Sequence, residues 1–163
     1  MKISIMSDSH DNWVNLASAV LISNENGCEY LLFAGDLIAP PQLAILEKFS
    51  GKVKLVWGNN EGERVILTRM MATSEKIELY GEIFEGEIGG IKIFMSHYPR
   101  ISELAAKSKE FDLCIFDHTH EYLESKIENT ILLNPGEIQG YKTGKASFII
   151  FDTETRSVNK IEL

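Results

Sequence analysis

The sequence predicts an α/β fold in which a βα half is followed by a mostly β half, with two packed sheets and helices outside. In the first half, short apolar runs alternate with segments whose apolar residues recur at helical spacing, which is typical of parallel βα units. From residue 82 onward, strand-like runs predominate. The sequence shows no linker, repeat or low-complexity tract, so we expect residues 1–163 to form a single domain.

Composition and charge exclude several classes of protein. The chain has 163 residues, of which 44% are hydrophobic and 25% charged, as in ordinary globular proteins. No apolar run approaches the roughly 20 residues of a membrane span. Asp8 and His10 interrupt the N-terminal apolar stretch that a signal peptide would need. We therefore expect a cytoplasmic protein without a membrane partner.

The acidic balance argues against a nucleic-acid partner. Sixteen Lys and Arg against 24 Asp and Glu give a net charge of −8, and no basic cluster is visible. A small phosphate-ester substrate stays open, because bound divalent ions can dominate the local charge. Cys28 and Cys114 each lie in or beside an apolar run, without a C-x-x-C pair, so we expect buried free thiols.

The first half contains three consecutive strand–helix units. We predict a strand at 2–7, a helix at 12–26, a strand at 30–34, a helix at 41–49, a strand at 53–57 and a helix at 63–71 covering the sheet. Pro41 suits the first turn of a helix, and Gly27 is placed to end one. A Gly or polar cluster follows each strand, which predicts a parallel sheet with a site along one edge.

The second half begins with a hairpin. Strands are expected at 82–88 and 91–95, joined by Gly89-Gly90. A helix at 101–109 and strands at 112–116, 122–127, 130–133, 146–151 and 157–161 follow. Edge strands near the C-terminus could pair between copies, so a homo-oligomer is left open.

Polar side chains collect where these strands end. They are Asp8, His10, Asp36, Asn59, His97, His118 and His120. This set contains all four histidines of the chain, which would otherwise be expected to scatter over loops and core edges. Carboxylate oxygen and imidazole nitrogen are ligands that zinc, manganese and iron accept. The pattern therefore predicts a metal site at the carboxyl edge of the sheets.

In this order, the motifs resemble the calcineurin-like metallophosphoesterase superfamily, in particular its compact bacterial and archaeal phosphodiesterase branch. The matching motifs are Asp8-x-His10, Gly35-Asp36, Gly58-Asn59-Asn60, His97 and His118-x-His120, with Asn134-Pro135-Gly136 at the end. The resemblance implies a four-layer α/β/β/α sandwich of two mixed β-sheets flanked by helices. It also implies a centre with two divalent metal ions, with manganese as the first choice and iron, nickel or zinc as alternatives.

The resemblance also implies a role for each residue. One metal would be held by Asp8, His10, Asp36 and His120, and the other by Asp36, Asn59, His97 and His118. Asp36 would bridge the two ions, and catalytic roles fall to Asp36, Asn59 and His97. The implied activity is hydrolysis of phosphodiesters, and of phosphomonoesters as a second class, by a hydroxide that bridges the metals.

Four positions depart from the usual family pattern. Asn60 replaces a histidine that protonates the leaving group in many larger relatives, so we expect aryl phosphodiesters to react faster than alkyl phosphates. Glu61 stands where Asp is frequent. Asp117, where Gly is usual, is a turn residue with positive φ, an acceptor that orients His118 or His120, or an extra charge that repels an anionic substrate. Glu137 is expected on a solvated rim.

An alternative function comes from another class of protein. The small retromer subunit resembles the same superfamily but serves as an interaction scaffold with an eroded metal site. The four intact histidines argue against such erosion in this chain. Metal content and hydrolysis of an aryl phosphodiester would distinguish an enzyme from a scaffold.

Overall fold

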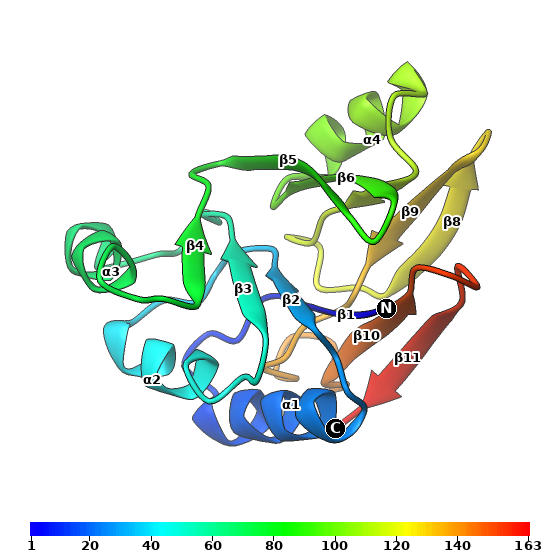
Figure 1. The fold of residues 1–163 in the computed structure, drawn as a ribbon. Coiled ribbons are helices and arrows are strands. Elements are labelled where there is room, and N and C mark those ends of the chain that lie inside the picture. The colour runs from blue at the N-terminus through cyan, green and yellow to red at the C-terminus, as the bar shows by residue number, and fades with distance from the viewer.

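The computed structural model describes residues 1–163 and contains two mixed β-sheets (Figure 1). The first sheet has the strand order β11 (Val158–Glu162), β10 (Ser147–Asp152), β1 (Lys2–Met6), β2 (Tyr30–Phe33), β3 (Lys52–Leu55) and β4 (Ile77–Leu79). The second has the order β5 (Ile83–Ile88), β6 (Ile91–Ser96), β7 (Leu113–Ile115), β9 (Thr130–Asn134) and β8 (Leu123–Ile127). Strands β1 to β4 run parallel, as do β6, β7 and β9.

Helices cover the outer faces of both sheets (Figure 1). Those on the first sheet are α1 (Trp13–Glu25), the 3₁₀ turn η1 (Pro40–Gln42), α2 (Leu43–Leu46) and α3 (Arg64–Met71). Helix α4 (Pro99–Ser108) covers the second sheet. The longest helix has 13 residues, and none combines the length and apolar character that a membrane crossing requires.

Three apolar clusters fill the three spaces between four layers. The period-2 alternation of strand side chains separates them. In β2, Leu31 packs toward the helices, whereas Leu32 packs between the sheets. In β7, Leu113 packs between the sheets, whereas Cys114 packs toward α4. The predicted α/β/β/α sandwich is therefore confirmed.

Two local predictions on the first sheet were wrong. The helix expected at 41–49 is a 3₁₀ turn followed by the single turn of α2. Strand β4 was missed, because three residues carry too little alternation to be recognised. Helix α3 does pack on the sheet, but only through Leu67 and Met71, while Val65 and Ile66 are exposed.

Both cysteines are buried free thiols, as expected. Burial raises the pKa of Cys28 to about 11 and that of Cys114 to about 12. Thiols with such pKa values are almost entirely protonated near neutral pH, so they behave as small apolar core residues.

Candidate metal centre

The loops after β1 and β2 are joined through their main chains. The amide of Asp8 donates to the carbonyl of Gly35 at 3.0 Å, and the amide of His10 donates to the carbonyl of Asp36 at 3.3 Å. Asp8 and Asp36 are buried, with 0% and 2% exposure. Two carboxylates from different strand ends are thus held next to each other inside the protein.

Two glycines allow the loops after β2 and β3 to touch. Gly35 has φ +103°, and a Cβ there would lie 2.6 Å from the backbone nitrogen of Gly58. A Cβ on Gly58 would collide with the Asp36 carboxylate. The Gly-Asp and Gly-Asn pairs of the sequence therefore have a steric cause, which is the close approach of one loop to the carboxylate of the other.

Glu61 braces the same two loops and was not recognised from the sequence as a functional residue. Its Oε1 accepts from the amides of Asp36 (2.6 Å) and Leu37 (3.3 Å), and its Oε2 accepts from the amide of Gly58 at 2.8 Å. Burial raises the pKa of Glu61, although these backbone donors oppose the shift. A glutamate three residues after Gly58 is the pattern that could have indicated such bracing.

The second sheet supplies three imidazoles to this cluster. His97 follows β6, and its Nε2 lies 3.7 Å from Asp36 Oδ2 and 3.0 Å from Asn59 Oδ1. The Nδ1 of His118, which follows β7, lies 2.8 Å from the same Asn59 oxygen. His120, which also follows β7, lies against Asp8 instead.

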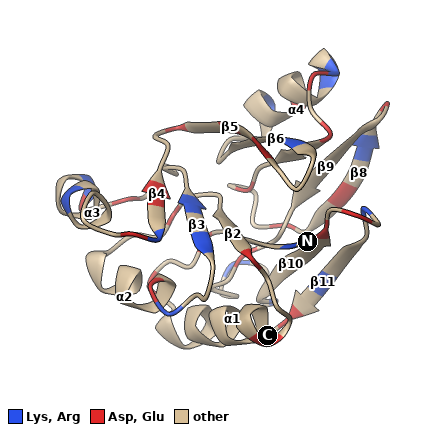
Figure 2. Cartoon of the chain, viewed as in Figure 1, with Lys and Arg blue, Asp and Glu red and all other residues tan.

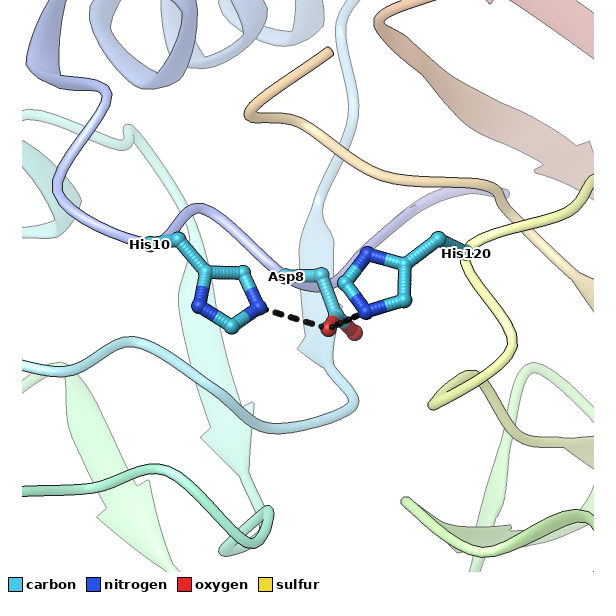
Figure 3. A group of neighbouring side chains, drawn as sticks. All are labelled: Asp8, His10 and His120. Atoms are coloured by element: carbon cyan, nitrogen blue, oxygen red, sulfur yellow. Dashed lines mark hydrogen bonds and ion pairs between the residues drawn. The ribbon is translucent and has the colours of Figure 1, made fainter. Parts of the chain in front are cut away.

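Asp8 connects the two sheets at the other side of the cluster (Figure 3). Its Oδ1 lies 3.0 Å from His10 Nε2 and 3.3 Å from His120 Nε2. The His10 nitrogen is also 3.4 Å from Asp36 Oδ2. All seven residues singled out in the sequence therefore converge on one place.

The carboxylate of Asp8 and the imidazole of His10 shift each other's pKa. Burial would raise the pKa of Asp8, but the hydrogen bond with His10 and the charge of His97 outweigh it, so the pKa is lowered. Burial would lower the pKa of His10, yet its hydrogen bond with Asp8 and the charges of Asp8 and Asp36 raise it. The charged forms of Asp8 and His10 are thus favoured.

The backbone of the cluster is strained. Ten non-glycine residues of the chain have positive φ, and five of them belong to the set of seven. These five are Asp8, His10, Asp36, His118 and His120. A left-handed conformation costs an L-residue on the order of 1–2 kcal/mol, and such strain concentrates where function requires a particular side-chain direction.

Two imidazoles are oriented through their second nitrogen. His97 Nδ1 donates to the carbonyl of Ala34 at 2.8 Å, which directs Nε2 toward Asp36. His120 Nδ1 lies 2.9 Å from Glu137 Oε2, which directs its Nε2 toward Asp8. Fixing one ring nitrogen in this way orients the other for a metal.

Glu137 is therefore not a rim residue, and that prediction was wrong. Its side chain is fully buried. Burial would raise the pKa of Glu137, but the amide and hydroxyl of Thr143, then Gln139 and His120, lower it. Its position directly after Asn134-Pro135-Gly136, the last family motif, was the one indication in the sequence.

Of the alternatives for Asp117, the structure excludes the positive-φ turn residue and shows a hydrogen-bond acceptor. It is fully buried and has no positive φ, and its Oδ1 accepts from the backbone amide of His120 at 3.1 Å. It therefore holds the main chain of His120, not its ring. Burial and the nearby Asp8 raise the pKa of Asp117 well above its usual range.

The donor set fits divalent cations. No Lys or Arg pairs with Asp8 or Asp36, and a buried carboxylate without a cationic partner is costly. Two groups of three side chains offer ligand atoms within 4.8 Å of one another. They are Asp8, His10 and His120, and Asp8, Asp36 and His97. The second group includes Asp8, which the implied second ligand set lacks.

Comparison with known proteins identifies the family. A family model for the calcineurin-like phosphoesterase superfamily domain matches residues 1–156. The chain belongs to the calcineurin-like phosphoesterase superfamily. A phosphodiesterase of Methanocaldococcus jannaschii is 32% identical over 165 residues, which cover 100% of this chain and 99% of that protein.

Solved structures agree with this calcineurin-like fold. A structure described as a novel archaeal phosphodiesterase, 32% identical, superposes with a TM-score of 0.94 over 100% of both chains. A phosphoesterase from E. coli has a TM-score of 0.71 at 16% identity over 99% of this chain and 98% of that one. Vps29 of Entamoeba histolytica, complexed with Zn²⁺, has a TM-score of 0.69 at 18% identity over 100% and 98%. At such identities the last two show the fold alone.

Proposed function

We propose that this protein is a metal-dependent phosphodiesterase with two divalent cations, held by the seven side chains of the cluster. The observation that carries the proposal is the position of Asp36, whose Oδ2 lies 3.4 Å from His10 Nε2 and 3.7 Å from His97 Nε2. A carboxylate has two oxygens with several lone pairs, so it can coordinate both cations at once. The M. jannaschii phosphodiesterase supports the same substrate class.

The remaining ligands divide between the two sides of Asp36. We assign Asp8, His10 and His120 to one cation, and Asn59, His97 and His118 to the other. When bound, such cations act as Lewis acids on phosphoryl oxygens and lower the pKa of water toward about 7. The oxygen and nitrogen donors, without thiolate, fit manganese, iron, nickel and zinc alike, and we take manganese as the first choice to test.

The chain's own residues set the geometry of the reaction. Asp36, Asn59 and His97 have the catalytic roles, because they lie together where the two sets of ligands meet. Asn59 is exposed and supplies a neutral oxygen, which limits negative charge at the entrance for an anionic substrate. His97 is fully buried and keeps one orientation through Ala34.

Charge on the remaining surface favours a small substrate. Figure 2 shows Lys and Arg scattered over several elements among Asp and Glu rather than gathered along one face. With a net charge of −8, the chain lacks the basic surface that a long nucleic acid needs.

The test of this function is metal content followed by hydrolysis. We expect about two metal ions per chain and turnover of bis(4-nitrophenyl) phosphate with added manganese. A chain that binds metal but hydrolyses no ester would instead be a scaffold. The Vps29 structures share the fold and leave that alternative open.

Asn60 leads to a prediction about the leaving group. Its backbone amide donates to Asp36 Oδ1 at 2.8 Å, its side chain is exposed, and an amide cannot protonate a departing alkoxide. General acid catalysis contributes about 10²–10⁴-fold, so without it alkyl phosphodiesters should react slower than aryl ones by their full intrinsic difference, with no compensation of this size. Rates with methyl and 4-nitrophenyl diesters at saturating metal would measure this, and equal rates would contradict it. Replacing Asn60 with His should reduce the difference in rate between alkyl and aryl phosphodiesters.

A further inference from the structure

A cavity of about 530 Å³ lies beside the metal centre, against His120. We propose that it binds a second phosphate group of the substrate, so that the preferred substrate is a phosphodiester that also carries a phosphate monoester. This inference rests on the proposed function and specifies its substrate class. None of Asp8, Asp36 or Asn59 lines the cavity, so it adjoins the cluster without being part of it.

Positive charge dominates the cavity. Lys142, Lys145 and Lys160 line it, against the single carboxylate of Glu121. Lys160 is already used, because its Nζ pairs with Glu162 at 2.6 Å. The ammonium groups of Lys142 and Lys145 make no ion pair and no hydrogen bond. Two free ammonium groups at one concave site, in a chain of net charge −8, favour an anion there.

The buried carboxylate of Glu137 holds both the loop that carries Lys142 and the imidazole of His120. Glu137 Oε1 accepts from the amides of Lys142 (2.9 Å) and Thr143 (2.7 Å). Glu137 Oε2 contacts His120 Nδ1 at 2.9 Å. An anion on this loop would therefore have a fixed position relative to His120, as a specificity site requires.

A phosphate is the anion that fits this chemistry. It offers several acceptor oxygens to ammonium donors, and Thr119, whose hydroxyl accepts from Asn134 and Glu121 and donates to no other group, adds a further donor to the lining. The phosphate could belong to the substrate or be free inorganic phosphate. The two sources differ in what they predict for catalysis.

The test uses two matched substrates, thymidine 5′-(4-nitrophenyl phosphate) with and without a 3′-phosphate. For the manganese-loaded enzyme we expect kcat/KM to be about tenfold higher with the 3′-phosphate, in line with a charge-assisted hydrogen bond. Lys145→Gln should reduce this ratio by most of that factor, chiefly through KM. Lys107→Gln, at an exposed position of α4, should leave both rates unchanged. A wild-type ratio of one, or a ratio that Lys145→Gln leaves intact, would overturn the proposal.

A binding measurement separates this proposal from the proposed function. In a titration with inorganic phosphate, the amide ¹⁵N signals of residues 142 and 145 should shift in the wild type. The same signals should not shift in Lys145→Gln. If no diester is hydrolysed with any metal, the proposed function fails, and the titration alone then judges the cavity. Phosphate-induced shifts together with equal rates on the two substrates would assign the cavity to free phosphate and overturn the substrate proposal.

Discussion

The two sheets contribute differently to the site. The loops of the first sheet carry every oxygen donor of the cluster, together with His10, and are fixed to each other by main-chain contacts such as Asp8 N to Gly35 O. The second sheet contributes only imidazoles, and two of these are oriented by single acceptors, Ala34 and Glu137. The loops of the second sheet are also joined through the main chain, by Asp117 N to His97 O at 3.1 Å, but the rings of two of its imidazoles depend on individual hydrogen bonds for their orientation.

This difference suggests how the site responds to change. On the first-sheet side, Gly35 and Gly58 leave no room for a side chain, and Glu61 ties both loops together. Substitution there should disturb both folding and chemistry. On the second-sheet side, an acceptor such as Glu137 can be altered with the imidazole still present, so metal affinity can change while the fold persists.

The largest effect is expected on the first-sheet side, at Asp36. Asp36→Asn keeps the oxygen that accepts from the Asn60 amide at 2.8 Å but removes the charge shared by both halves of the site. We expect kcat/KM to fall by roughly 10³-fold or more, because several kcal/mol of metal-dependent stabilisation is lost. Kinetics on an aryl phosphodiester and metal analysis would measure this.

Asp112→Asn is the matched control for that change. Asp112 precedes β7, at the opposite end of the strand from His118, and pairs with Arg156 at 2.9 Å. Its loss should leave activity and metal content at wild-type levels. Comparable losses in the two variants would mean that a general charge effect, rather than the bridging position, governs activity.

An intermediate effect is expected on the second-sheet side, at Glu137. Glu137→Gln removes the negative acceptor that orients His120, and such changes reduce metal affinity by about 10–100-fold. Activity should recover at high metal concentration, because His120 itself remains. Competition with a chelator would measure the affinity, with Glu124→Gln, an exposed partner of Tyr122, as the control. If Glu137→Gln left the metal affinity unchanged, Glu137 would not be the residue that positions His120.

The sequence predicts the residues of the cluster better than the residues that support them. Asp8 and His118 are recognisable because each follows an apolar run within a few residues, and strand ends of one sheet meet at one edge. Glu137 lies 17 residues from His120, and Glu61 lies 25 from Asp36. Their roles depend on how loops pack in three dimensions, which local periodicity does not encode.

The cavity against His120 illustrates the same limit of prediction from sequence. Lys142 and Lys160 come from a loop and from strand β11, and neither belongs to a basic run in the sequence. Only the antiparallel pairing of β10 with β11 and the contact of the loop with Glu137 place them together. The absence of a basic cluster in the sequence therefore excluded a long groove but not a local anion site.

The smallest predicted effect concerns a property that both sheets share, the positive φ of residues in the cluster. His118 has φ +64°, so in metal-free protein His118→Gly should be more stable than His118→Ala by about 1 kcal/mol, although neither retains the imidazole. Urea denaturation would measure the difference. At Ala17, an exposed position in the interior of helix α1, the order should reverse, with Ala more stable than Gly by about 1 kcal/mol. If Ala were the more stable residue at both positions, the left-handed backbone would not be a source of strain at His118. The rigidity of this side would then have to come from its hydrogen bonds alone.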